Sequence, residues 1–225
     1  MTSATRAPSA QQDAVRLLLL IATVALPVPS PPPPDCPPDS VAVLHSQKLL
    51  QKLDFWLRNP DYLANELISR FQRDGNFDDL ALAQEILDSD EPELRSYPML
   101  RHWFGAYEPL DQALAVLRTP GLVVRRKQGV PGQTAQHDYY LMKKGRETAD
   151  QIVRTIPALK YYADRTLLVR DLAAGRRGNA LAEVQYLQPE YADAAMGAQI
   201  AGIASRTRAR LKTLLTELES SNANG

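Results

Sequence analysis

Apolar side chains recur every three or four residues over most of this chain, which is the spacing of one face of an α-helix. The pattern predicts helices over residues 11–26, 40–73, 79–87, 109–118, 144–156, 158–174 and 194–219. Asn59-Pro60 should divide the second of these helices, because proline disfavours the helical conformation in the residue before it. Asp74-Gly75-Asn76 is typical of a turn.

Two segments favour strands instead, namely Leu122 to Lys127 and Asp138 to Met142. The residues between them contain glycine and proline, which is typical of a hairpin connection. Met99 to Phe104 is a further candidate strand. The expected fold class is therefore mainly α with a small β-hairpin (α+β).

Eight prolines occupy the thirteen residues from Pro27 to Asp39. Proline lacks a backbone donor and clashes with the preceding turn of a helix, so this density excludes a helix or a central strand. We expect a stiff, extended connection after the first helix.

The segment Leu17 to Leu26 consists of ten apolar or small residues. It is about half as long as a bilayer requires, so no membrane partner is expected. Two interpretations remain. One is a buried first helix, which Asp13 just ahead of the segment favours. The other is a signal peptide, with Arg6 and Arg16 upstream and a cleavage site at Thr23-Val24-Ala25. The second would make this a secreted protein.

The composition is that of a globular protein, with 44% hydrophobic and 23% charged residues among 225. Twenty-six basic residues balance twenty-six acidic ones, which removes a pervasive positive field as an argument for nucleic acid but permits a local patch. The single cysteine, Cys36, excludes an internal disulfide framework and favours the cytoplasm. The three histidines lack ligand spacing, so no metal or cofactor is expected.

No catalytic motif is evident. The glycine-containing segment from Gly175 to Leu181 lacks the Gly-Lys-Ser/Thr of a P-loop, and no Gly-x-Ser-x-Gly elbow occurs. We therefore expect a protein that is not an enzyme. Aromatic residues at these spacings are expected to pack in the core rather than form a ligand pocket: Trp56, Trp103, Phe104, Tyr107, Tyr139 and Tyr140.

The stretches "RTPGLVVRRK" and "DYYLMKKGRETADQI" resemble winged-helix proteins of the PadR and MarR type. The match covers about 30 residues, with Met142 where those families have threonine. From Ala14 to Tyr191 the chain also resembles the middle components of bacterial ABC-three-component conflict systems. These resemblances imply a winged helix-turn-helix core, and the second implies an intracellular adaptor between an ATPase and an effector.

The expected organisation has four parts. Residues 1–12 are a disordered N-terminus, and residues 13–156 form a winged-helix domain with the proline-rich insertion at 27–39. Residues 157–219 form a C-terminal helical extension, and residues 220–225 are a disordered tail.

Two sets of residues are candidates for binding. Those for nucleic acid lie on or beside the hairpin of residues 122–142, which would be the wing of a winged helix: Arg118, Arg125, Arg126, Lys127, Lys143, Lys144 and Arg146. Those for a partner helix form the apolar seam of the last helix: Ile200, Ile203, Leu211, Leu214, Leu215 and Leu218. In a DNA-binding winged helix the helix before the wing, here residues 109–118, enters the major groove. Glu108 and Asp111 at its leading end would repel phosphates, so base reading is not expected.

The favoured function is a protein-interaction adaptor in a multicomponent bacterial defence system. The alternative is a PadR-like or MarR-like regulator that dimerises through the last helix and contacts DNA phosphates with the wing.

Overall fold

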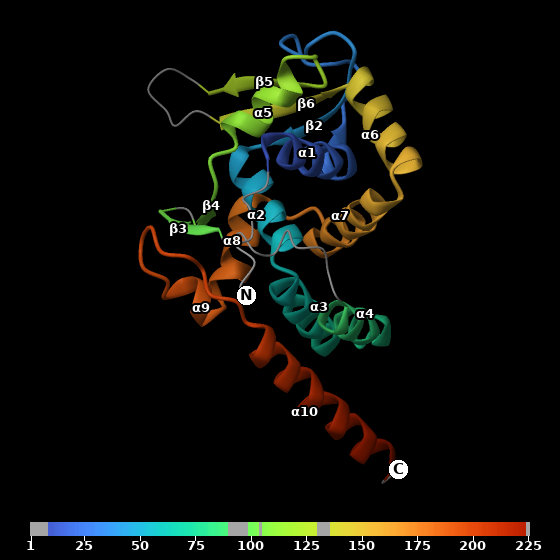
Figure 1. Ribbon diagram of the computed structural model, residues 1–225, viewed down its shortest axis with the longest axis vertical. Coiled ribbons are helices and arrows are strands. Elements are labelled where there is room, and N and C mark those ends of the chain that lie inside the picture. Colours follow the sequence, from blue (N-terminus) through green and yellow to red (C-terminus); the bar gives the residue numbers. More distant parts are fainter. Residues whose placement is uncertain (1–8, 90–98, 104, 130–135, 224–225) are drawn as a thin grey trace, which may run out of the picture.

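The computed structural model describes residues 9–89, 99–103, 105–129 and 136–223. The helices are α1 (Ala10–Val24), α2 (Gln47–Arg58), α3 (Pro60–Asp74), α4 (Phe77–Asp88), α5 (Asp111–Arg118), α6 (Lys143–Thr155), the 3-10 turn η2 (Pro157–Leu159), α7 (Lys160–Ala173), α8 (Gly178–Tyr186), α9 (Pro189–Ala192) and α10 (Ala204–Ala223). The strands are β1 (Leu26–Pro27), β2 (Ser40–His45), β3 (Leu100–His102), β4 (Gly105–Tyr107), β5 (Val123–Gln128) and β6 (Gln136–Met142). The prediction of a mainly helical α+β protein is confirmed (Figure 1).

The larger sheet has the strand order β1-β2-β6-β5, and all of its neighbouring strands are antiparallel. The pair β5–β6 is the predicted hairpin, with Val123 opposite Leu141. The prediction of a helix from residue 40 is wrong for residues 40–45, which form β2 and pair with β6. Four apolar residues in a row suit a buried strand as well as a helix, and the neighbouring strand decides between them.

The boundaries of the next helices follow local signals. Ser46, at a φ of 74°, separates β2 from α2, and its side chain accepts a hydrogen bond from the backbone N–H of Leu49 at 3.1 Å. The predicted break at Asn59-Pro60 is confirmed, since α2 ends at Arg58 and α3 begins at Pro60. Gly75 then ends α3 in the left-handed conformation, with a φ of 75°.

The proline-rich segment lies over one face of the larger sheet (blue, at the top of Figure 1). Its start forms β1, an edge strand, which is where a sheet tolerates proline. Farther on, the side chain of Gln128 donates a hydrogen bond to Asp35. Tyr140 is buried, and burial with Asp35 and Cys36 nearby raises the pKa of its phenol. The segment therefore covers a face of the sheet as well as connecting two elements.

The apolar N-terminal segment forms the centre of the core, as the buried-helix interpretation predicted. Leu17, Leu20 and Ile21 of α1 are fully buried, and the helix packs against α5, α6 and α7. Ser9 begins α1 with a capping box formed with Gln12. Helix α1 thus starts inside the segment expected to be disordered, whose residues 1–8 lie outside the described part of the chain.

The last helix differs from its prediction at both ends. It begins at Ala204 rather than Ala194, and it continues to Ala223, inside the tail expected to be disordered. Residues 194–203, predicted to be helical, lie outside α10. They include Gly202 and Gly197, which has a φ of 77°, and glycine disfavours helix. The preceding segment runs beside β3 instead, because the N–H of Arg101 donates to the carbonyl of Ala198 at 2.8 Å. Figure 1 shows α10 passing below α3 and α4, which it contacts, with its C-terminal end far from the sheet.

Candidate interaction surfaces

The hairpin β5–β6 carries three of the cations proposed for nucleic acid. Arg126 and Lys127 are exposed, whereas Arg125 is half-buried. The Nη1 atom of Arg125 lies 3.1 Å from Oδ1 of Asp111 at the start of α5. Adjacent strand residues point to opposite faces, so Arg126 lies on the face away from this ion pair. The three cations therefore do not share one surface.

The helix after the hairpin carries three further candidates. Lys143 and Lys144 are exposed, and Lys144 Nζ donates to the carbonyl of Pro120 at 3.3 Å. The guanidinium of Arg146 donates to the carbonyl of Ala22 in the last turn of α1. Carbonyls in the last turn of a helix lack partners within it, so Arg146 stabilises the end of α1. Two of the three cations thus have partners inside the chain.

Helix α5, the expected recognition helix, exposes little that would bind DNA. Asp111 and Gln112 at its start and Arg118 at its end are exposed. The expectation that Glu108 also meets the approaching phosphates is wrong, because Glu108 forms an ion pair with Arg58 of α2. The leading end still carries the exposed carboxylate of Asp111, which repels phosphate.

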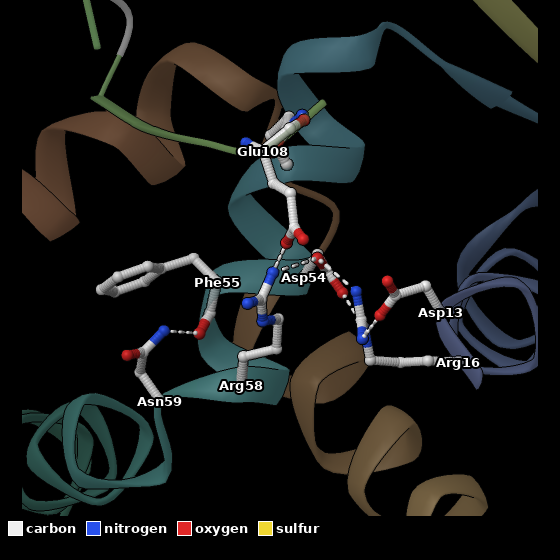
Figure 2. A network of polar contacts seen from close by, with 8 residues as sticks. Asp13, Arg16, Asp54, Phe55, Arg58, Asn59 and Glu108 are labelled. Atoms are coloured by element: carbon white, nitrogen blue, oxygen red, sulfur yellow. Dashed lines mark hydrogen bonds and ion pairs between the residues drawn. The ribbon is translucent and has the colours of Figure 1, made fainter. Parts of the chain in front are cut away.

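Glu108 belongs to a buried network of ion pairs that joins α1 and α2 to the segment before α5. Figure 2 shows Arg16 between Asp13 and Asp54, and Arg58 between Asp54 and Glu108. Arg16 Nε lies 2.8 Å from Oδ1 of Asp54, whose side chain is completely buried. Each buried charge has an opposite charge beside it, so the network is consistent with a role in holding the three segments together. Helical spacing places Asp54 beside an apolar face and four residues from Arg58, but its nearer partner, Arg16, lies 38 residues away in the sequence.

The hairpin β3–β4 and two segments beside it expose apolar side chains. The exposed residues, which we call the apolar patch, are Leu100 (46% exposed), Trp103 (77%), Leu187 (75%) and Met196 (48%). The prediction of a core position is wrong for Trp103, because it lies in the turn after β3. It is confirmed for Trp56, Tyr139 and Tyr140, whereas Tyr107 is half-buried and Phe104 lies outside the described residues.

Contacts of Arg101 bring the segments of the apolar patch together. Its guanidinium stacks on the ring of Tyr186, 4.8 Å from the centroid, next to Leu187. Its carbonyl accepts a hydrogen bond from the N–H of Gly197 at 2.8 Å, next to Met196. Leu100 and Trp103 therefore lie on the hairpin itself. Leu187 and Met196 lie next to residues that contact it.

Two polar side chains, one from α2 and one from α9, attach the hairpin β3–β4 to the rest of the chain. Lys52 of α2 is completely buried, and its Nζ donates to the Oη of Tyr191 at 2.6 Å. The same Oη accepts a hydrogen bond from the N–H of Ala106 at 2.7 Å. Burial, together with neighbouring positive charges, lowers the pKa of Lys52 to about 7. Its spacing from Leu49 and Trp56, three and four residues away, was the signal that it lies beside an apolar face.

Gly105 makes this close packing of the hairpin feasible. It has a φ of 95°, and a Cβ at this position would lie 2.1 Å from Tyr191 Oη and 2.3 Å from Lys52 Nζ. Any other residue would displace both groups. The hairpin is thus attached to α2 and α9 by contacts that allow little change.

The proposed partner seam of the last helix is used largely inside the chain. Two of its members, Ile200 and Ile203, are buried and precede α10, so the prediction of one helical seam is wrong. Leu211 is also buried, while the remaining members are half-buried against the core: Leu214, Leu215 and Leu218. The guanidinium of Arg210 donates to the side chains of Asn65 at 2.6 Å and Ser69 at 3.0 Å on α3. Polar and apolar contacts together therefore dock α10 on its own chain as far as Leu218.

A scan against protein-family models and searches of curated proteins and of solved structures found no match to this chain. Within the described ranges, no helix is both long and apolar enough to cross a membrane. Nor do the described residues bring together three or more His, Cys, Asp or Glu side chains able to hold a metal ion.

Proposed function

We propose that this chain is a non-catalytic protein-interaction adaptor built on a winged-helix core, and that the apolar patch contacts its protein partner. Apart from β1 before β2, and α3, α4, β3 and β4 between α2 and α5, the elements follow in the order α1, β2, α2, α5, β5, β6, α6. This order, with β2, β6 and β5 as neighbours, supports a winged-helix core. An adaptor of a multicomponent system, as the resemblance to conflict-system proteins implies, needs a surface for other proteins. The exposure of Trp103 carries this proposal.

The apolar patch has the chemistry of a protein interface. Large exposed apolar areas are uncommon on monomers, and tryptophan is enriched among the residues that dominate binding energy. Trp103 also lies on a hairpin that is held by Tyr191 and Lys52, so it loses little conformational freedom on binding. The apolar patch is therefore preorganised for binding.

The proposal is tested by affinity purification of tagged protein from cells that express it naturally. The wild-type protein, Trp103→Ala and Phe77→Ala are compared, because Phe77 is also an exposed aromatic residue, at 62%, on α4. We expect one defined protein to co-purify with the wild type and Phe77→Ala and to be lost with Trp103→Ala. The purified partner should then bind the wild-type chain directly.

The control for folding is thermal unfolding, in which all three proteins should be alike because both substituted side chains are exposed. Equal recovery of every co-purifying protein with Trp103→Ala and with the wild type would contradict the proposed surface.

A second candidate function is a DNA-binding regulator, which the exposure of Arg118, Arg126, Lys127 and Lys143 favours. Within the described residues these four have no ion-pair partner, and together they could neutralise several phosphates. Fluorescence anisotropy with a random duplex tests this candidate at low and at physiological salt. Salt-sensitive binding that is lost in a combined Arg126→Ala and Lys127→Ala variant would support the regulator over the adaptor.

A further inference from the structure

A groove with a volume of about 700 Å³ lies where the ends of β2, α2 and α8 meet. Four separate segments of the chain line it, within residues 24–26, 43–49, 136 and 175–179. This volume is within the range of pockets that bind small molecules. None of the residues of the apolar patch lines the groove.

The charged side chains that line the groove are all basic. Lys48, Arg176 and Arg177 are the formally charged residues, His45 adds an imidazole, and neither Asp nor Glu occurs among the described lining residues. The whole chain has as many acidic as basic residues, so the groove concentrates one sign of charge. Such clefts attract anions.

Two of these three cations interact with other side chains of the chain, and the third, Arg177, has no ion pair among the described residues. Lys48 Nζ donates to the side chain of Asn179 at 2.7 Å, and Arg176 lies 3.9 Å from Glu66. The exposed Arg177 forms no ion pair with any described residue. The guanidinium of Arg177 is thus available to an anion without breaking an existing ion pair.

The starts of α2 and α8 meet at the same groove. A Cβ on Gly178 would lie 2.8 Å from the backbone nitrogen of Leu49, which shows how closely the two helix ends approach. The N-cap residue of α8, Arg177, has no side-chain oxygen, so the first N–H groups of α8 receive no side-chain cap. Two helix N-termini add partial positive charge to that of the side chains.

The remaining wall of the groove is apolar. Val24, Leu26, Val43 and Leu49 line it, and Leu26 is 63% exposed. A ligand that carried only negative charge would leave this leucine in water. The wall therefore favours a ligand with an apolar or planar body beside its anionic group.

We propose that this groove binds a small organic phosphate, with the phosphate at Arg177, Lys48 and the start of α8 and the organic body over Leu26. Guanidinium and ammonium groups bind phosphate by charge-assisted hydrogen bonds, and backbone N–H groups at a helix start add further donors. The proposal is independent of the proposed protein partner.

Isothermal titration calorimetry at physiological salt tests the proposal with three probes: adenosine 5′-monophosphate, adenosine and inorganic phosphate. We expect the nucleotide to bind more tightly than inorganic phosphate, and adenosine to bind most weakly of the three. Arg177→Glu should weaken nucleotide binding about tenfold or more, since a charge-assisted hydrogen bond becomes a repulsion. Arg118→Glu, an equally exposed charge reversal outside the groove, should bind as the wild type does.

Thermal unfolding of both variants without ligand controls for folding, and exposed positions such as these should leave it unchanged. The proposal is overturned if neither the nucleotide nor inorganic phosphate binds, if adenosine binds as tightly as the nucleotide, or if Arg177→Glu binds the nucleotide like the wild type. It is also overturned if both charge reversals weaken binding equally, because the effect would then be one of net charge.

Discussion

The two β-hairpins of this molecule are built in opposite ways. The hairpin β5–β6 is attached by apolar burial, with Tyr139 and Leu141 fully buried, and it exposes charged residues such as Arg126. The hairpin β3–β4 is attached by the buried polar pair of Lys52 and Tyr191, and it exposes Trp103. The first also buries a charge, Asp138 of β6, but pairs it with His45, so the second departs further from the usual distribution of apolar residues inside and charged residues outside.

That departure is informative because both of its parts oppose stability. Within the described part of the chain Lys52 has no carboxylate partner, and a buried lysine of this kind costs free energy, as does a tryptophan left in water. The charges on β5–β6 need no such explanation, since charged residues on an edge strand protect a sheet from pairing with other chains. The difference favours β3–β4 as the surface for a partner, even though β5–β6 carries the sequence motif.

The largest expected effect concerns the attachment of β5–β6. Tyr139→Ala removes a fully buried aromatic side chain from β6 and should lower the free energy of unfolding by about 3 to 5 kcal/mol. Urea unfolding measures this change. Phe77→Ala, at an exposed position, should cost far less. A loss of stability for Tyr139→Ala as small as that of the control would show that β6 is not part of the core.

An intermediate effect concerns the attachment of β3–β4. The pKa of Lys52 is about 7 in the folded state, against a usual value of 10.5. Between these pH values the unfolded chain binds more protons, so the stability contributed by this group rises with pH. Between pH 7 and pH 9 the wild type should gain about 2 kcal/mol more stability than Lys52→Met, which has no amine to titrate.

Urea unfolding at the two pH values measures this difference, and the comparison with the variant cancels the contributions of other groups. Lys127→Met, at an exposed position on β5, is the matched control and should follow the wild type. If Lys52→Met gained as much stability as the wild type, Lys52 would be protonated in the folded state, with its charge satisfied.

The smallest effect concerns the ion pair between Arg125 and Asp111. The carboxylate of Asp111 is 77% exposed, so Asp111→Ala should change the free energy of unfolding by less than about 0.5 kcal/mol. Asp111→Ala is informative about DNA binding instead, because the variant frees Arg125 from its ion pair and removes a negative charge that repels phosphate. If the wing contacts phosphates, duplex affinity measured by anisotropy should rise in this variant. If β5–β6 has only a structural role, the affinity should remain negligible.

The sequence predicted those elements whose hydrophobic pattern is long or is bounded by proline or glycine. Helix α1, the break at Asn59-Pro60 and the hairpin β5–β6 all follow from local periodicity or proline. Strand β2 was missed because a run of four apolar residues becomes a strand only beside β6. The start of α10 was misplaced because residues before Ala204 pair with β3, a contact between positions about a hundred residues apart.

The candidate surfaces were harder to predict than the fold. The cations of the wing are evident in the sequence, but the partners of Arg125, Lys144 and Arg146 are contributed by other elements. Trp103 has an apolar side chain, and local spacing does not reveal that its hairpin turns it toward solvent. The groove at Arg177 is formed by four segments, and no single segment carries a motif for it.

Site-specific photo-crosslinking in cells that express the protein naturally compares the two hairpins in one experiment. A photoreactive phenylalanine analogue replaces either Trp103 on β3–β4 or Arg126 on β5–β6, both of which are exposed. We predict that position 103 crosslinks to one defined protein and that position 126 crosslinks neither to that protein nor to DNA. Crosslinks to DNA from position 126, with none to protein from position 103, would contradict the adaptor and support the regulator.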